Sequence, residues 1–179
     1  MTLELAVIAV VRVLGSLPVL RWAFAGALLA IAIDLSDLFM RDLLELGGVP
    51  DYQRADKWLD QVYLGLFLVA ALRWQGLERT VSIGLYAFRM TGFLAFELTG
   101  ERLLLVLVPN VFEFWFVLVA GLHAAGRQIT WTMPRLVVTL AVLTVLKEVQ
   151  EVAIHGLKLF DGISAVGAVD LILRWLTGR

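Results

Sequence analysis

The chain has 179 residues, of which 60% are hydrophobic and 17% are charged, whereas soluble domains contain about 25% charged residues. The net charge of −1 gives no basic field to attract nucleic acid, and the lack of cysteine excludes disulfides, thiolate metal sites and cysteine nucleophiles. We therefore expect one all-α domain over residues 1–179, a polytopic helix bundle in the cell membrane. Its partner would be the lipid bilayer, with homo-oligomers left open.

Apolar stretches separated by turn signals predict about six transmembrane helices, within a range of five to seven. Five are well defined and a sixth follows them, at about residues 20–44, 53–73, 79–98, 102–124, 135–157 and 162–176. The stretch 2–17 is ambiguous, because it is short, contains Arg12 and ends at Pro18. It either spans the bilayer with strain or lies at the interface. The first residues include Glu4 and no lysine or arginine, so they lack the positive region of a cleaved signal peptide.

Basic residues predict the orientation of the bundle. One end, side A, collects more of them than the opposite end, side B, and cytoplasmic loops carry an excess of lysine and arginine. Side A is therefore expected to be cytoplasmic, with the turns at 74–78 and 125–133, and the turn at 45–52 to be extracytoplasmic. His123 falls near side A with no acid near it in this arrangement, and a structural role is expected. The basic residues of side A are Arg21, Arg73, Arg79, Arg127, Arg135, Arg174 and Arg179.

Acidic residues are concentrated in the half of the bundle nearest side B. Asp34 and Asp37 are three residues apart, and Asp56 and Asp60 are four apart, so each pair lies on one helical face. A carboxylate that faces lipid costs several kcal/mol, so we expect these acids to line a polar cavity that opens to the extracytoplasmic side. Four carboxylates so close together would bind a divalent cation, Mg²⁺, Mn²⁺ or Ca²⁺, or hold at least one proton.

A second polar group is expected near the middle of the membrane. Arg89, Glu113 and Lys147 lie at that depth, and Asn110 follows Pro109, which removes a backbone donor. We expect Glu113 to pair with Arg89 or Lys147, either within a functional network or as a purely structural neutralisation of buried charge. Further candidates for the network or the cavity are Arg41, Lys57, Glu97, Glu148, Glu151 and His155.

The acids between residues 34 and 60 resemble a known signature. The order Asp34-x-x-Asp37-x-x-x-Arg41, then Asp56-x-x-x-Asp60, is similar to that of the CDP-alcohol phosphatidyltransferases, D-x-x-D-G-x-x-A-R followed by G-x-x-x-D-x-x-x-D. The match covers 27 of the 179 residues, and members of that family are similarly small six-helix proteins. The resemblance implies two metal ions that hold a diphosphate, with Asp60 as the base.

The chain also departs from that signature. Leu38, Met40 and Tyr52 stand where the family has glycine, alanine and glycine, and the second half of the motif begins two residues late. The family's site faces the cytoplasm, whereas the arginine distribution places these acids on the opposite side. The match alone therefore does not assign the family.

Three functions remain open. The acidic cavity would bind or transport a cation or a proton-coupled small solute; it would be the site of a metal-dependent enzyme that acts on a lipid phosphate; or the charges would only specify helix pairing in a non-catalytic accessory subunit. We favour the first, because the sequence contains no complete catalytic signature, no Gly-rich phosphate loop and no Ser-His-Asp arrangement.

Overall fold

The computed structural model describes residues 2–44, 52–101, 104 and 107–151, and every regular element in these residues is a helix. This confirms the all-α prediction for that part of the chain, whereas the helix expected at 162–176 lies outside it. Among the described residues, two helical runs are long and apolar enough to cross a membrane, Leu3–Leu20 and Gly76–Thr99. The elements, in order, are α1 (Leu3–Ser16), the 3-10 helix η1 (Leu17–Leu20), α2 (Ala23–Leu44), α3 (Tyr52–Ala71), α4 (Gly76–Thr99), α6 (Val111–Ala124) and α7 (Met133–Glu151).

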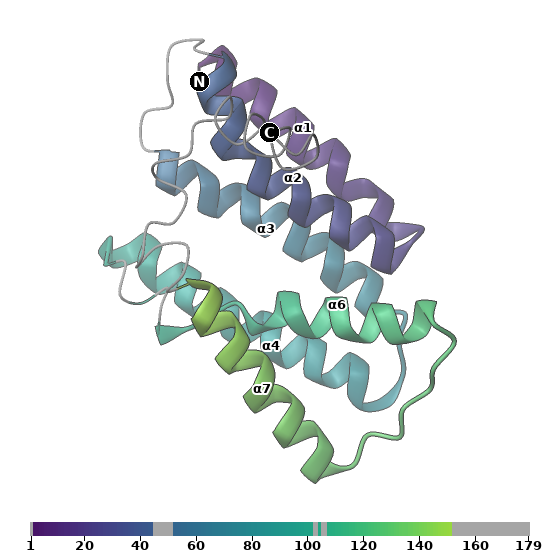
Figure 1. Cartoon of the computed structure of the whole chain (residues 1–179). Helices are drawn as coiled ribbons and strands as arrows, with labels where there is room; N and C mark the ends of the chain where they lie inside the picture. The colour runs from purple at the N-terminus through teal and green to yellow at the C-terminus, as the bar shows by residue number, and fades with distance from the viewer. Residues whose placement is uncertain (1, 45–51, 102–103, 105–106, 152–179) are drawn as a thin grey trace, which may run out of the picture.

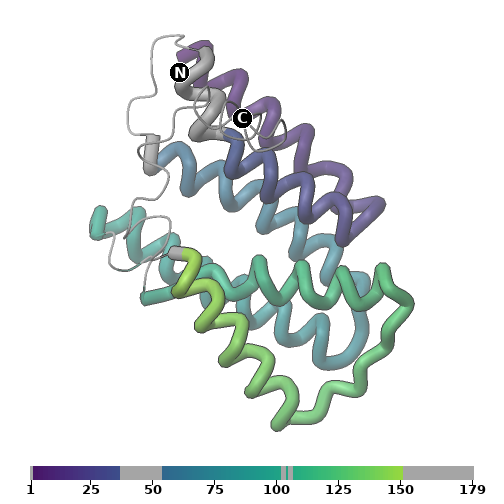
Figure 2. Tube along the Cα trace, viewed as in Figure 1, coloured from purple at the N-terminus to yellow at the C-terminus, as the bar shows by residue number. Residues whose placement is uncertain are grey.

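The helices form two groups that meet along α6 and where α3 packs against α4 (Figure 1). Helices α1, α2 and α3 pack side by side, and each contacts the other two. Helix α6 contacts α2 and α3 of this group and also α4 and α7, and the tube in Figure 2 shows α4, α6 and α7 grouped apart from α1 and α2. Because α6 touches both groups, a polar side chain on it can reach residues of either.

The ambiguous stretch 2–17 is helical and continues through Pro18. Thr2 caps α1 by accepting a hydrogen bond from the Leu5 backbone at 3.3 Å, and Pro18 lies near the start of η1, where its missing N–H costs nothing. Helix α2 then returns against η1 so closely that a Cβ on Gly26 would lie 2.3 Å from the backbone nitrogen of Val19. Glycine at position 26 therefore permits the tight α1–α2 hairpin.

The helix predicted over residues 102–124 is interrupted, because α6 begins only at Val111. Pro109 supplies no N–H to the preceding turn and disfavours helical geometry at Val108, so the backbone is not helical at residues 108–110. Val108 packs directly over Gly92 of α4, where a Cβ would meet its side chain at 2.6 Å. The Arg89 guanidinium donates to the Val108 carbonyl at 2.9 Å and satisfies an acceptor near the break.

Aromatic rings fill the junction between the two groups of helices. Phe67 of α3 stacks on Phe116 of α6 with ring centroids 4.4 Å apart, and Trp74 stacks on the same ring at 5.0 Å. Trp115 faces the other way, toward α4 and α7, and donates its indole N–H to Ser82 at 3.0 Å. These buried rings hold α6 in a fixed rotation, which determines where its polar residues point.

The helices expose large apolar side chains and also bury several polar or charged ones, beside a core of buried apolar residues. Large apolar side chains are exposed along one face of α7, at Val138, Val142, Val145 and Val149. The outer face of α1 is similarly apolar. The buried side chains, in contrast, include the polar or charged residues Glu4, Arg12, Ser16, Asp60, Ser82, Arg89, Asn110, Glu113 and Lys147.

The described ends of α3, α4 and α6 fall at two ends of the bundle, in the grouping that the sequence predicts. At side A, the Arg73 guanidinium donates to the Leu20 carbonyl, and Trp74 contacts the His123 ring with centroids 5.5 Å apart. At side B, Arg54 at the start of α3 forms a salt bridge of 2.8 Å with Glu97 near the end of α4. The antiparallel order of α3, α4 and α6 is therefore as expected.

Candidate functional site

Three of the four predicted aspartates meet at one point, around an arginine that the sequence analysis had not assigned to the site. Arg12 of α1 donates to Asp34 of α2, to Asp56 of α3 at 2.9 Å and to Asp60 of α3 at 2.7 Å. The Arg12 side chain is only 3% exposed. Its guanidinium therefore ties three helices together through charge-assisted hydrogen bonds.

Lys57 is the second cation of this group. Its ammonium lies 2.9 Å from Asp56 and 3.0 Å from Asp60. Asp56 and Asp60 each give one carboxylate oxygen to Arg12 and the other to Lys57. We refer to Arg12, Asp34, Asp56, Lys57 and Asp60 as the Arg12 cluster.

The members of the Arg12 cluster differ in how far their side chains are exposed to solvent. The Asp60 side chain is 10% exposed, whereas those of Asp34, Asp56 and Lys57 are between 22% and 26% exposed. Arg12 and Asp60 thus form its inner part and the other members its rim. Among these described side chains, three acids face two bases, so the cluster carries one excess negative charge if every group is ionised.

The geometry of the acids would suit a cation, but Arg12 already fills that position. Asp34, Asp56 and Asp60 each offer one oxygen, and these atoms all lie within 4.8 Å of one another. Opposite ligands of Ca²⁺ are about 5 Å apart. Arg12 is hydrogen bonded to an oxygen of each of these three carboxylates. A metal ion held by the three acids would therefore compete directly with the guanidinium.

Several predicted site residues cannot be compared with the structure. The side chains of Asp37, Arg41 and Glu151 lie outside the described residues, as does His155. The prediction that Asp37 shares a site with the other aspartates therefore stays a prediction. The same is true of the extracytoplasmic turn at 45–52.

Glu113 lies in a second buried site, where the hydrogen bonds that it accepts come from neutral groups. Its Oε2 accepts from the Tyr63 hydroxyl and from the Asn110 amide, both at 2.9 Å. The other side-chain atom of that amide, the Asn110 Oδ1, is buried and has no hydrogen-bond donor among the described residues. We refer to Tyr63, Asn110 and Glu113 as the Glu113 site. Its pairing with Arg89 or Lys147 stays a prediction.

The other predicted polar residues have separate surroundings. Arg89 binds the Val108 carbonyl, as described above. Lys147 is buried on α7, donates to Gln150 at 2.9 Å and lies 5.6 Å from the centroid of the Phe114 ring. Glu148 is half-buried on the same helix. Glu97 binds the exposed Arg54, so these two form a surface pair at side B.

Sequence reasoning missed an acid beside His123. The ring nitrogen Nε2 of His123 lies 2.8 Å from Glu78, whose other carboxylate oxygen accepts the indole N–H of Trp131 at 2.9 Å. The expectation of no acid near His123 was therefore wrong. Glu78 and His123 lie on different helices at side A, and the packing of α4 against α6 brings them together.

Arg12 and Tyr63 are the main residues of these sites that sequence reasoning failed to assign. A single arginine within an otherwise apolar stretch was a usable signal, because such a charge must face a partner or a polar interior. Tyr63 follows Asp60 by three residues, which places it near the same helical face.

No protein-family model matches the chain, and neither the curated proteins nor the solved structures contain a match to it.

Proposed function

We propose that the chain is an integral membrane protein with several membrane-spanning helices. Two helical runs meet the length and hydropathy of a span, and Ala23–Ser36 and Val111–Ala124 are shorter apolar helices. Asp34 of α2 and Asp56 and Asp60 of α3, which lower the hydropathy of these helices, are turned toward Arg12, while the valines of α7 are exposed. Apolar groups outside and paired charges inside are the arrangement that a bilayer requires.

This location is tested with single introduced cysteines, since the chain contains none. Gln75 is exposed at side A and Glu101 at side B. A membrane-impermeant maleimide should label Glu101→Cys in intact cells, and should label Gln75→Cys only after the cells are opened. Labelling of both positions in intact cells would exclude a span between them, and the reversed pattern would invert the orientation.

Within the membrane, we propose that the Arg12 cluster binds a cation or a proton and couples this to the passage of a small solute. The observation that supports this function is the balance of three buried or half-buried carboxylates against two bases. Among the described residues the cluster carries one excess negative charge, and in the membrane interior such a charge would be met by a proton or by a cation from solution.

Arg12 gives this proposal a definite mechanism. Its guanidinium competes with an incoming cation for Asp34, Asp56 and Asp60, so binding would release Arg12 from at least one of them. Release of Arg12 would loosen the contact of α1 with α2 and α3, because the arginine is hydrogen bonded to acids of both helices. Occupation of the site is thereby coupled to helix movement, which is what a transporter requires.

The metal-dependent enzyme is the second candidate, and the convergence of three carboxylate oxygens within 4.8 Å favours it. Here Asp34, Asp56 and Asp60 would hold a divalent cation, which would polarise the phosphate of a lipid substrate. Arg12 would leave the acids and take its place beside that phosphate. The resemblance to the phosphatidyltransferases rests on the quoted motif alone.

The deciding measurement is thermal stability against Mg²⁺, Mn²⁺, Ca²⁺ and pH, for the wild type and for Asp34→Asn. This substitution removes the excess charge and leaves two acids against two bases. Glu97→Gln is the matched control, an acid of the same end that pairs with Arg54 outside the cluster. A metal-dependent gain lost only in Asp34→Asn supports a metal site, and a gain on lowering the pH alone supports proton coupling.

Flux through reconstituted vesicles then separates transport from catalysis. A pH-sensitive or metal-sensitive dye inside the vesicles should report entry with the wild type and with Glu97→Gln, but not with Asp34→Asn. If all three proteins respond alike in stability and flux, the cluster only fixes helix pairing, as in an accessory subunit.

A further inference from the structure

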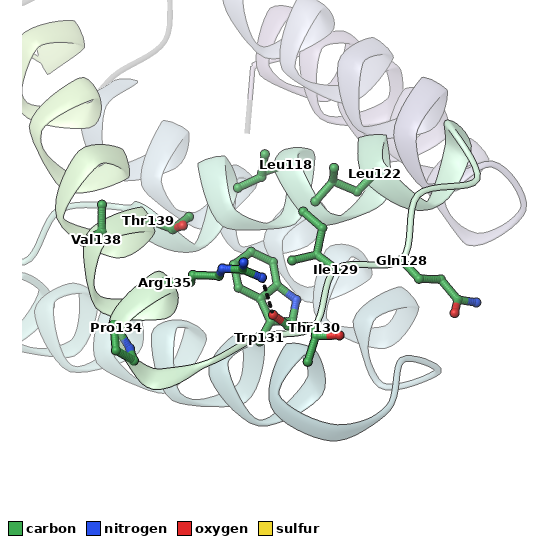
Figure 3. Close-up of a pocket in the computed structure, with 10 residues that line it drawn as sticks. All are labelled: Leu118, Leu122, Gln128, Ile129, Thr130, Trp131, Pro134, Arg135, Val138 and Thr139. Carbon is green, nitrogen blue, oxygen red and sulfur yellow. Dashed lines mark hydrogen bonds between the residues drawn. The ribbon is translucent and has the colours of Figure 1, made fainter.

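A pocket of about 780 Å³ lies between α6 and α7, remote from the Arg12 cluster. Figure 3 shows Leu118 and Leu122 entering it from α6, Arg135 and Val138 from α7, and the loop at 128–131 closing a third side. Its volume falls within the range of about 300–1,000 Å³ that is usual for small-molecule sites. We refer to it as the α6–α7 pocket.

The α6–α7 pocket joins an apolar wall to a cationic edge. Leu118, Leu122 and Val138 form the apolar part, and Arg135 provides the positive charge. One Arg135 nitrogen donates to the Thr130 carbonyl at 3.4 Å, which uses one of the five N–H groups of a guanidinium. The Trp131 ring is anchored by Glu78 at 2.9 Å, so this wall is held in place.

The position of the pocket indicates what it would bind. It lies at side A, among the arginines that predict a cytoplasmic face, and anionic lipids are concentrated in the cytoplasmic leaflet. Its apolar wall is continuous with the exposed face of α7, because Val138 belongs to both. An acyl chain that leaves the pocket can therefore run along Val142 and Val145 in contact with apolar side chains.

We propose that the α6–α7 pocket binds an anionic phospholipid, with the phosphate at Arg135 and part of an acyl chain against Leu118, Leu122 and Val138. A basic group beside an apolar groove at the cytoplasmic side of a helix bundle matches both parts of such a lipid. The proposal rests on the membrane location proposed above, but it does not depend on the function of the Arg12 cluster.

The test compares melting temperatures of the purified protein in a neutral detergent. Phosphatidylglycerol and phosphatidylcholine with identical acyl chains are added separately, and glycerol 3-phosphate tests the phosphate without the chains. Phosphatidylglycerol should raise the melting temperature of the wild type by several degrees more than phosphatidylcholine, because a ligand that binds only the folded state stabilises it. Glycerol 3-phosphate should have no comparable effect.

Substitutions at Arg135 and Thr139 test whether the lipid effect arises at the α6–α7 pocket. Arg135→Gln should abolish the difference between the two lipids, whereas Arg79→Gln, an exposed arginine of the same end outside the pocket, should retain it. Thr139→Phe places a ring in the pocket and should abolish retention of phosphatidylglycerol in native mass spectrometry. Lipid retention in Thr139→Phe still tests the proposal if Arg135→Gln folds poorly.

Three outcomes would overturn the proposal: no difference between the lipids in the wild type, an unchanged difference in Arg135→Gln, or equal stabilisation by glycerol 3-phosphate. Asp60→Asn should retain the lipid effect, so loss of the proposed cation site and loss of the lipid site are distinguishable. If single-cysteine labelling excludes a membrane location, the lipid proposal fails with it.

Discussion

The Arg12 cluster and the Glu113 site are both buried, but they compensate negative charge in different ways. In the Arg12 cluster, Asp56 and Asp60 each contact two cations, and those cations reach them from α1 and from α3 itself. The carboxylate of Glu113 accepts its hydrogen bonds from a hydroxyl and an amide. The first arrangement links helices through full charges, whereas the second stabilises one acid with dipoles.

This difference determines how each site responds to loss of a group. Removing one partner of a buried ion pair leaves an uncompensated charge, which is among the most costly changes in a protein interior. Removing a neutral hydrogen-bond donor costs less, because no charge loses its counter-ion. The two sites can therefore be distinguished by matched substitutions, and the expected effects range over several kcal/mol.

The largest effect is expected for Arg12→Gln. It leaves Asp34, Asp56 and Asp60 opposed by Lys57 alone within the cluster, and should lower the free energy of unfolding by about 3–5 kcal/mol near neutral pH. Protonation of these acids would remove the uncompensated charge, so the loss should be smaller at acidic pH. Melting in detergent between neutral and acidic pH measures both effects. A variant as stable as the wild type at neutral pH would mean that water already compensates the acids.

A smaller loss is expected for Glu113→Leu. The Tyr63 hydroxyl and the Asn110 amide would lose their acceptor in a buried site, at a cost of about 2–4 kcal/mol. Glu113→Gln is the matched control, since its amide oxygen can still accept both hydrogen bonds, and it should cost less than about 1 kcal/mol. From the sequence alone, with a charged partner assumed, the same change would cost about 3 kcal/mol. A loss of that size in Glu113→Gln would therefore support the predicted ionic pairing with Arg89 or Lys147.

Tyr63→Phe should be milder again. It removes one donor to Glu113 and keeps the ring, whose centroid lies 5.3 Å from that of Phe67. We expect a loss of about 1 kcal/mol. Together with Glu113→Leu it forms a double-mutant cycle. The double variant should lose less stability than the sum of the two single losses, because both substitutions remove the same hydrogen bond.

The smallest effect is expected for Arg54→Gln. Its partner Glu97 lies at the surface, and the Arg54 side chain is 58% exposed. Exposed ion pairs contribute about 0–1 kcal/mol, so the change in melting temperature should be close to the experimental error. A loss comparable with that of Arg12→Gln would show that exposure does not explain the contrast between the two kinds of ion pair.

The sequence predicted the convergence of Asp34, Asp56 and Asp60 because helical spacing and a short turn are local properties. The helical period places Asp56 and Asp60 on one face, and antiparallel neighbours bring Asp34 to the same depth. The partner of these acids was not predicted, because Arg12 lies on a helix whose role was ambiguous. Its contact with Asp34 depends on how α1 packs against α2, where Gly15 approaches Ile33, and this is a tertiary contact.

The Glu113 site could be predicted only in part. Asn110 and Glu113 are three residues apart, so their contact follows from the start of α6. Tyr63 is fifty positions away from Glu113, and its place depends on how Phe67 and Phe116 stack between α3 and α6. The sequence indicated that Pro109 removes a backbone hydrogen-bond donor. It did not indicate that the backbone leaves the helical conformation before Val111.

The interruption before α6 has a mechanical consequence. Val108 contacts α4 in two ways. Its carbonyl accepts a hydrogen bond from Arg89, and its side chain packs over Gly92. The residues after it, from Val111 onward, pack as a helix against α2, α3 and α7 as well as α4. Pro109 and Asn110 therefore connect a point anchored on α4 to a helix shared by four neighbours. A rotation of α6 relative to α4 would change the backbone angles at these two positions. Because the Asn110 amide donates to the Glu113 carboxylate, the same rotation would also change the surroundings of that acid.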